Sequence, residues 1–374
     1  MSLTPLLTFL RGLFSPKLKY ITPKVLILSM FSREAEVWYN IPEFDVLAQK
    51  IPIPGVSPLS PYLHCTQDES VCQLTIGEGL VNAAASVTAL TLSPLVDLRK
   101  TYILVAGVAG VNPKLATIGS VTFARYSVQV GLQYEIDARE LPPGWETGYF
   151  AQGTKEPGQF PEILYGTEVF EVNDALRRLV SAAATKARLK DTHECEELRI
   201  RYRASTALAA ANFPPSIVLC DTLTSDTFWG GSRLGTAFEN TMKTFTNGSG
   251  VYCTAQQEDN AILAALHRAS LVQRADFARI VIMRSASNFD RPPDGRSALE
   301  SLRGPSPGFA PALSNLYVAG VKIVELILGE WEDTFERGVS PSNRVGDVFR
   351  ALRRRVDDST RTGAGVPTAE RAEL

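Results

Sequence analysis

Two adjacent acidic residues, Glu258 and Asp259, precede an apolar stretch in the segment TAQQEDNAILAAL. The pattern predicts a helix with Thr254 as its N-cap and with Gln257, three residues later, completing a capping box. On such a helix both carboxylates would face apolar side chains of the next turn, where an unpaired charge is unfavourable. The acids therefore either interact favourably with the positive end of the helix dipole or belong to a polar binding site.

Polar clusters also follow four apolar segments that are predicted to be buried strands: Val25–Met30, Thr101–Ala106, Ser216–Cys220 and Arg279–Met283. In an α/β sheet, ligands bind beyond the carboxyl ends of the strands. One glycine or polar cluster after a strand is usually only a tight turn, but four at one edge of a sheet indicate a site. The clusters are FSREAE at 31–36, GVAGVN at 107–112, DTLTSDTFWGG at 221–231 and RSASNFDR at 284–291.

Strands that alternate with helices predict an α/β fold whose sheet is covered by helices on both faces. Residues 137–168 are rich in Gly, Pro and aromatic residues and predict a long irregular loop, of the kind that often has a function. Further strands are expected at Val71–Ile76, Ile118–Tyr126 and Val128–Tyr134, the last two in an antiparallel part. Helices are expected after Gly77 and at Asn173–Leu189, Thr236–Phe245, Pro311–Leu328 and Asn343–Val356.

The domain organisation follows from this order of elements. No internal repeat or linker interrupts the alternation, so residues 24–356 are predicted to form one domain. Residues 1–23 are predicted to be an N-terminal extension, and residues 357–374 a flexible C-terminal tail.

Composition and charge argue against several classes of protein. The formal net charge is −2 and the pI is near 6.1, so the composition gives no indication of a basic surface that binds nucleic acid. No apolar run approaches the roughly 18 residues needed to cross a bilayer, so no membrane span is expected. A cytoplasmic location is expected, while a secretory or vacuolar location stays open.

The five cysteines include no Cys-x-x-Cys pair, and their number is odd. Reduced thiols are therefore expected rather than a zinc site or a disulfide framework. A bridge between Cys65 and Cys72 across a hairpin-like segment stays open for a secreted chain. The three histidines show no metal-ligand spacing, so neither a metal nor a cofactor is expected. Asn247-Gly-Ser249 is a glycosylation sequon, which is informative only in a secreted protein.

Four long motifs occur in order: DLRKTYILVAGVAGVNP, GLQYEIDARELPPGW, YCTAQQEDNA and RSASNFDRPP. On these motifs, from about residue 24 to 330, the chain closely resembles the purine nucleoside permease family. A wider resemblance reaches the nucleoside phosphorylase and nucleosidase superfamily. Five segments of this chain are similar to patterns of that superfamily. They are residues 77–84 (Gly-x-Gly-x-x-x-Ala-Ala), 107–110 (Gly-[Ser/Thr]-Ala-Gly), 224–228 (Ser-Gly-Asp-x-Phe), 257–261 (Met-Glu-x-x-Ala) and 284–288 (Arg-x-x-Ser-Asp). The resemblance implies a nucleoside phosphorylase-like fold, with a central mixed twisted sheet flanked by helices.

The resemblance also implies roles for individual residues. Glu258 matches the glutamate that accepts hydrogen bonds from the ribose 2′ and 3′ hydroxyls. Phe228 matches the aromatic residue that packs on the purine, with Trp229 as a second wall. Asn288 matches the residue that faces purine N7, and Glu34 matches the acid that holds the attacking water. The remaining substrate contacts are expected from Gln257, Asp259, Gly107, Val108, Ala109 and Gly110; Asp259 contacts the substrate or only orients Glu258.

These residue types suit cleavage of an N-glycosidic bond, which passes through an oxocarbenium-like state. A carboxylate at the ribose stabilises the positive sugar, and a hydrogen-bond donor at N7 stabilises the departing base. The chain departs from the superfamily in having Asn288 where nucleosidases have Asp, and Asp290 is an alternative acid. Val108 replaces the hydroxyl that helps to hold phosphate, and MFSREAE replaces the phosphate loop. Water is therefore favoured over phosphate as the nucleophile.

The predicted function is hydrolysis of purine nucleosides to free base and ribose. The alternatives are a phosphate-dependent phosphorylase, a non-catalytic nucleoside-binding component of uptake, and the same scaffold recruited to a biosynthetic reaction. By analogy with the superfamily, a homo-oligomer, either a dimer or a trimer, is expected.

Overall fold

The computed structural model describes residues 20–350. The predicted tail at 357–374 and most of the predicted extension at 1–23 lie outside the described residues. The centre of the fold is a group of parallel strands, in which β1 (Val25–Ser29) lies between β4 (Val71–Thr75) and β5 (Tyr102–Val111). β14 (Ile280–Phe289) pairs with β5 in the same direction. These strands are buried on both faces, which explains their nearly continuous apolar sequences.

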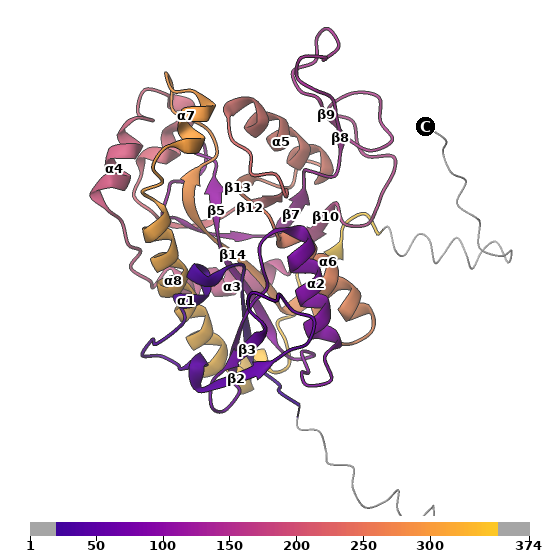
Figure 1. Ribbon diagram of the computed structural model, residues 1–374, viewed down its shortest axis with the longest axis vertical. Coiled ribbons are helices and arrows are strands. Elements are labelled where there is room, and N and C mark those ends of the chain that lie inside the picture. The colour runs from indigo at the N-terminus through magenta and orange to yellow at the C-terminus, as the bar shows by residue number, and fades with distance from the viewer. Residues whose placement is uncertain (1–19, 351–374) are drawn as a thin grey trace, which may run out of the picture.

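The sheet extends to both sides of this centre (Figure 1). Its order is β15-β10-β7-β12-β13-β5-β1-β4-β3-β2, while β14 pairs with β5 and β6, and β11 pairs with β6. β12 runs parallel to β13, whereas β13 runs antiparallel to β5, so the prediction of a mixed sheet is confirmed. The further strands are β2 (Gln49–Pro52), β3 (Tyr62–Cys65), β6 (Val121–Ala124), β7 (Tyr126–Gln129), β10 (Val169–Glu171), β11 (Ile217–Leu219), β12 (Asp221–Thr224), β13 (Tyr252–Gln256) and β15 (Gly346–Asp347).

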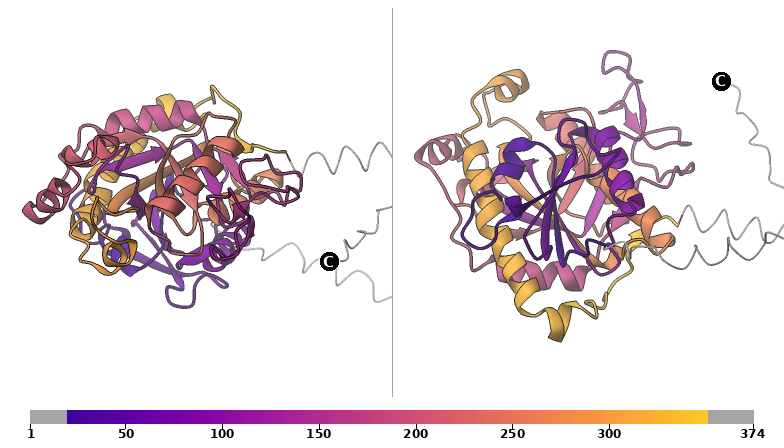
Figure 2. Two further views of the ribbon diagram at one scale, coloured as in Figure 1. Left: turned by 90° about the horizontal axis from the view of Figure 1, so that it is seen from above. Right: turned by 60° about the horizontal axis from the view of Figure 1, so that its bottom comes forward.

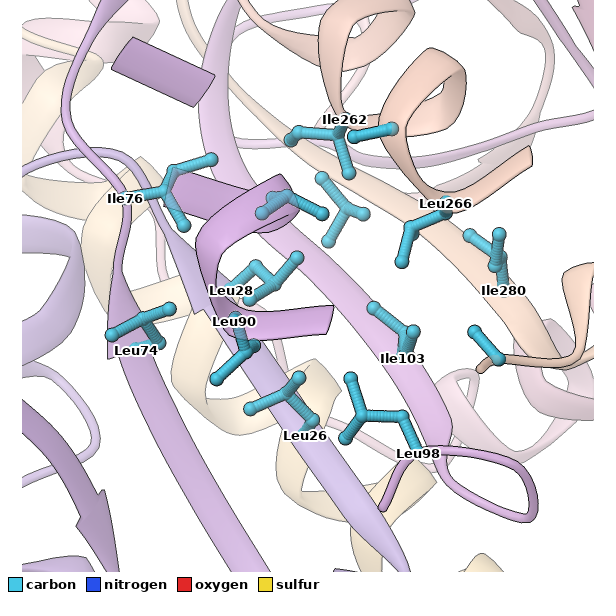
Figure 3. Close-up of a cluster of buried hydrophobic side chains, with 14 of the residues drawn as sticks. Leu26, Leu28, Leu74, Ile76, Leu90, Leu98, Ile103, Ile262, Leu266 and Ile280 are labelled. Carbon is cyan, nitrogen blue, oxygen red and sulfur yellow. The ribbon is translucent and has the colours of Figure 1, made fainter. Parts of the chain in front are cut away.

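One face of the sheet is covered by α2 (Gly79–Leu92) and α6 (Asp259–Leu271). Leu28 of β1, Leu90 of α2 and Ile262 of α6 are buried in the same cluster, which Figure 3 shows. Burial of a leucine or isoleucine side chain stabilises a fold by about 1.5–3 kcal/mol. This cluster therefore fixes the start of α6 against the ends of the central strands.

The opposite face is covered by α3 (Asp174–Ala184) and α8 (Phe309–Gly329) (Figure 2). Ile27 of β1 points to this side because successive strand residues alternate between faces. It is buried with Val180 of α3 and Leu316 of α8, so the predicted helix layers on both faces are confirmed. The other helices are α1 (Ser32–Glu36), α4 (His193–Ile200), α5 (Ser232–Phe245) and α7 (Ala298–Arg303).

Strands β5 and β14 are longer than the sequence predicts. They pair in parallel from Ile103 and Ile280 as far as Val111 and Phe289, with one irregularity after Ala286. The glycine-containing segment 107–110 and most of the polar segment 284–291 thus lie within strands instead of turns. Pairing along the whole length of two buried strands has outweighed the local turn preference of glycine and serine.

Two predicted helix positions are wrong. The helix predicted from Thr254 begins at Asp259, because β13 occupies residues 252–256 and pairs with β12 and β5. In the predicted helix Asn343–Val356, residues 346–347 form the short strand β15, which pairs with β10. Gly346 has a φ of +110°, outside the helical region, and residues 351–356 lie outside the described part of the chain.

Helix α8 is the element that bears on the expectation of no membrane span. Within residues 20–350 it is the one helix long and apolar enough, by length and composition, to cross a membrane. Ser314, Asn315, Lys322 and Glu325 interrupt its sequence, so a search for an unbroken apolar run overlooks it. In the structure 56% of its apolar window is buried, and its inner side packs on the sheet as a core helix does.

The cysteines are also not as predicted. Cys65 and Cys72 form a disulfide between β3 and β4, as the alternative allowed, and Cys220 and Cys253 form a second one. Only Cys195 is a free thiol, and it is buried. The Cys220–Cys253 bridge joins residues 33 positions apart, and the two become neighbours only when β12 and β13 pair. Local spacing therefore gave no sign of it.

Candidate functional site

A cavity of about 380 Å³ lies where the four polar clusters meet. Each cluster contributes lining residues: Phe31 and Glu34 from 31–36, Val108, Ala109 and Gly110 from 107–112, Ser225 and 227–231 from 221–231, and Arg284 and 287–290 from 284–291. The loop that joins β13 to α6 adds Gln257 and Glu258 to the wall. The structure thus brings together the residues predicted from the strand ends, although several of them lie inside the strands.

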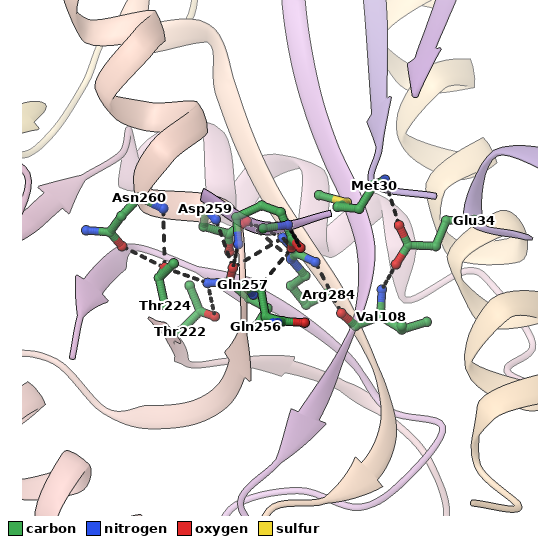
Figure 4. Close-up of polar contacts among 12 residues, drawn as sticks. Met30, Glu34, Val108, Thr222, Thr224, Gln256, Gln257, Asp259, Asn260 and Arg284 are labelled. Carbon is green, nitrogen blue, oxygen red and sulfur yellow. Dashed lines mark hydrogen bonds and ion pairs between the residues drawn. The ribbon is translucent and has the colours of Figure 1, made fainter. Parts of the chain in front are cut away.

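The start of α6 is organised by Gln256 instead of the predicted Thr254. The Gln256 Oε1 atom accepts hydrogen bonds from the backbone N–H groups of Glu258 (2.7 Å) and Asp259 (2.8 Å). Its Nε2 atom donates to Thr224 Oγ1 at 2.8 Å on the neighbouring strand (Figure 4). Gln256 therefore satisfies N–H groups that a helix start leaves without partners, and it ties that start to β12. A glutamine at the end of a strand gave no capping signal.

Arg284 lies beneath the two acids and binds both. Its Nη2 atom is 2.5 Å from Asp259 Oδ1 and 3.2 Å from Glu258 Oε2, and all three side chains are buried. Burial alone would lower the pKa of Arg284, but Asp259 and Glu258 outweigh burial and raise it. Arg284 Nη1 donates to the Val108 carbonyl at 3.1 Å, so the guanidinium also joins α6 to β5.

The Glu258 carboxylate closes this corner of the cavity. Its Oε1 atom accepts the Gly79 N–H at the start of α2 (3.1 Å), and its Oε2 atom accepts from Arg284. Burial raises the pKa of Glu258, and Arg284 partly offsets that effect. A buried carboxylate that is held on two sides and lines a cavity is suited to accept hydrogen bonds from the hydroxyls of a ligand.

Glu34 stands on α1, across the cavity from α6 (Figure 4). Its Oε1 atom accepts the Val108 N–H at 2.6 Å, and its Oε2 atom accepts the Met30 N–H at 2.8 Å. Burial raises the pKa of this carboxyl to about 8, although Arg284 acts in the opposite direction. A carboxyl with this pKa can exchange a proton near neutral pH.

Gly107 has no room for a side chain. A Cβ atom there would lie 2.5 Å from Arg284 Nη1 and 2.9 Å from Glu34 Oε1. Glycine at this position therefore lets the guanidinium and the Glu34 carboxyl approach the same stretch of β5. Val108, Ala109 and Gly110 continue along the cavity wall.

Asn288 and Asp290, the two candidates for contact with a leaving base, have different surroundings. Asn288 lines the cavity, and its Oδ1 atom accepts from Ser287 Oγ at 2.8 Å; its Nδ2 atom donates one hydrogen to the Phe289 carbonyl at 3.4 Å and keeps a second one for a ligand. Asp290 accepts from Tyr252 Oη at 2.6 Å and from Arg291 Nε at 2.9 Å. Burial raises the pKa of Asp290, and Arg291 lowers it. Its oxygens are therefore already held inside the protein.

Phe228 and Trp229 both line the cavity, but they differ in exposure. Phe228 is 61% exposed, so its ring is available to a flat ligand at the mouth. Trp229 is partly buried against Phe238, with ring centroids 5.0 Å apart. Trp229 is therefore also a core residue, and Phe228 is the freer of the two aromatic surfaces.

One part of the wall could not be predicted from the sequence. Phe309, at the start of α8, stacks on Phe31 with ring centroids 6.3 Å apart, and both rings line the cavity. Leu302 of α7 and Tyr202, just after α4, complete this side. The Ser297 and Glu300 capping box marks the start of α7, but nothing in the sequence indicates that this helix covers a site. Within residues 20–350, no group of three or more His, Cys, Asp or Glu side chains could hold a metal ion.

Comparison with known proteins agrees with the motifs. Residues 22–340 match the family described as purine nucleoside permease (NUP). The purine nucleoside permease of Candida albicans is 43% identical over 336 residues, covering 88% of this chain and 81% of that protein. A probable purine nucleoside permease of Schizosaccharomyces pombe is 40% identical over 319 residues, covering 83% of this chain and 90% of that protein.

Solved structures with a similar fold share little sequence with this chain. A futalosine hydrolase of Helicobacter pylori superposes with a TM-score of 0.48 and 13% identity, covering 82% of this chain and 98% of that one. A 5′-methylthioadenosine/S-adenosylhomocysteine nucleosidase of Neisseria meningitidis superposes with a TM-score of 0.45 and 17% identity, covering the same shares of the two chains. The family match and the curated relatives, which extend over most of the sequence, show that the chain belongs to the purine nucleoside permease family.

Proposed function

We propose that the protein hydrolyses the N-glycosidic bond of purine nucleosides and releases free base and ribose. The observation that carries the proposal is the placement of Glu258, Glu34 and Asn288 in the wall of one cavity. These are the three residues that the motif resemblance assigns to the ribose, the attacking water and the base. They come from α1, from the start of α6 and from β14, so only the folded chain brings them together.

In the proposed reaction, a water oxygen attacks C1′ while the bond from C1′ to the base nitrogen breaks. The bonding electron pair leaves with the base, and the Asn288 amide stabilises the resulting negative charge by donating to N7. Glu34 takes the proton that the water loses, and the base is protonated from solvent. Glu258 accepts hydrogen bonds from the ribose hydroxyls and stabilises the positive charge that develops on the sugar.

The charges around the cavity favour water over phosphate. Arg284 is already bonded to Asp259, to Glu258 and to the Val108 carbonyl. The Val108 N–H, which would otherwise face an anion, donates to Glu34. A phosphate there would meet the Val108 side chain, which offers it no hydrogen bond donor, and the Glu34 carboxyl, which repels an anion once it is ionised.

A second candidate function is nucleoside binding without turnover, as a component of uptake. The curated relatives are named purine nucleoside permeases, and these names favour a role in uptake. The homo-oligomer predicted by analogy stays part of the proposal for either function, and light scattering of the purified protein tests it.

Product analysis separates these possibilities. The purified protein is incubated with inosine, adenosine and guanosine in phosphate-free buffer and in phosphate buffer, and the sugar products are identified by mass spectrometry. Hydrolysis predicts free base and ribose at equal rates in both buffers. Ribose 1-phosphate that forms only with phosphate would contradict the choice of water. Binding without any product would favour the second candidate.

A further inference from the structure

The two disulfides are placed where the fold itself aligns the sulfur atoms. Cys65 and Cys72 are direct partners in the antiparallel ladder of β3 and β4. Cys220 and Cys253 lie where β12 and β13 begin to pair, and all four residues are buried. Disulfides persist in oxidising compartments and are rare in the cytosol. The disulfides therefore favour the secretory or vacuolar alternative over the expected cytoplasmic location.

An independent feature points to the same environment. Asn247-Gly248-Ser249 is the only Asn-x-Ser/Thr triplet with x other than Pro in the 374-residue sequence. It forms the turn after α5, where Asn247 has a φ of +50° and Gly248 a φ of +78°. The Gly248 N–H donates to the Lys243 carbonyl at 2.7 Å, which fixes the turn. All three residues of the triplet are exposed, and the side-chain amide of Asn247 makes no hydrogen bond to the rest of residues 20–350.

We propose that Asn247 carries an N-linked glycan and that the chain is oxidised and glycosylated in the same compartment. The donor is an oligosaccharide linked to a lipid diphosphate. A bond forms from Asn247 Nδ2 to the sugar C1, the bond from C1 to the diphosphate oxygen breaks, and the amide releases one proton. The diphosphate leaves with the electron pair. Each disulfide forms when two thiols pass two electrons and two protons to a thiol–disulfide oxidant. This proposal does not depend on the proposed function.

The position of Asn247 leaves the candidate active site open. Asn247 lines a second cavity, of about 910 Å³, between α5 and the irregular loop predicted at 137–168. None of the residues that line this second cavity also lines the first. A glycan on Asn247 therefore covers the second cavity, and its removal is expected to leave nucleoside turnover unchanged.

The test uses the full chain, carrying a C-terminal tag and purified from the cells that naturally make it. Intact mass is measured before and after an amidase that removes N-glycans, and peptide mapping identifies Asn247 by its conversion to Asp. The proposal predicts loss of the glycan mass from the wild type. Asn247→Gln and Ser249→Ala should lack the glycan, whereas Ser249→Thr should keep it. Asn240→Gln, an exposed asparagine of α5 outside any sequon, is the matched control and should also keep it.

The thiols are counted on the same sample. The protein is denatured and alkylated without reduction, and the proposal predicts one alkylated cysteine, Cys195. An unmodified Asn247 in the wild type, or five alkylated cysteines, would overturn the proposal. Because a variant that fails to fold also loses its native disulfides, the thiol count separates misfolding from loss of the acceptor.

Discussion

Arg284 and Asp259 form an ion pair with 2.5 Å between Nη2 and Oδ1, and both side chains are almost completely removed from solvent. The same guanidinium nitrogen binds Glu258, so one arginine balances two neighbouring carboxylates at the start of α6. Burial raises the pKa of Asp259, and Arg284 acts against it. The arrangement explains why two acids can follow one another at a buried helix start: Asp259 neutralises the arginine that orients Glu258.

Removing Asp259 tests this relationship. We expect Asp259→Ala to lower the free energy of unfolding by about 3–5 kcal/mol, because the buried guanidinium loses its shorter ion pair and the two hydrogen bonds that its Nε and Nη2 atoms donate to Asp259. Urea denaturation followed by circular dichroism measures the change. Asp137→Ala is the control, since Asp137 pairs with Arg139 at the surface, and its unfolding curve should match that of the wild type. Equal curves for both variants and the wild type would show that the buried pair contributes nothing.

Gly107 provides a geometric test. In Gly107→Ala the new methyl group meets Arg284 Nη1 and Glu34 Oε1, so both side chains must shift. A misplacement of about 1 Å lowers turnover by about a hundredfold, and we expect a loss of kcat/KM of that order. Gly329→Ala is the matched control, because a Cβ atom there meets no heavy atom within 4 Å. Unchanged kinetics in Gly107→Ala would argue against Arg284 and Glu34 as parts of the site.

Asn288 and Asp290, the two candidates for contact with the leaving base, can be separated by the kinetics of their variants. Asn288→Ala should lower kcat by about a hundredfold to a thousandfold, the usual effect of removing a donor that stabilises developing charge. Asp290→Asn should change kcat much less, because Arg291 and Tyr252 already hold the Asp290 oxygens. Its main effect should be a lower melting temperature. The opposite pattern would assign the leaving base to Asp290.

Glu34 predicts a pH dependence. Its pKa is raised to about 8, and it must be ionised to accept a proton from water. The ionised fraction grows as the pH rises through that value, so kcat should increase from pH 6 and level off above about pH 8. Glu34→Gln should be slow at every pH and should lose this rise. A wild-type profile that is flat between about pH 6 and 9 would exclude Glu34 as the base.

The parts of the fold that were predictable are those that short-range patterns control. The short apolar segments around Val25 and Val71 indicate buried strands, and the periodicity after Asn173 indicates a helix. The meeting of the polar clusters also followed, because strand ends of an α/β sheet share one edge.

The rest depends on contacts between distant parts of the chain. Strand pairing, which no local pattern reveals, placed Gly107 inside β5 and brought Cys253 to Cys220. The role of Gln256 as a cap requires the turn that only the packed helix α6 creates. Phe309 joined the site because α8 crosses the sheet beside α1, a relationship of tertiary structure alone.

The most direct measurement is the release of free base from inosine in phosphate-free buffer by the wild type, by Glu258→Gln and by Glu78→Gln. Glu78 also lines the cavity, but it is exposed, so it is the matched control. Free hypoxanthine and ribose are expected from the wild type and from Glu78→Gln. Glu258→Gln should have a rate lower by about a hundredfold or more and an unchanged circular dichroism spectrum. Absence of base release by the wild type would contradict the proposed hydrolysis, and a wild-type rate in Glu258→Gln would contradict the role of Glu258 at the ribose.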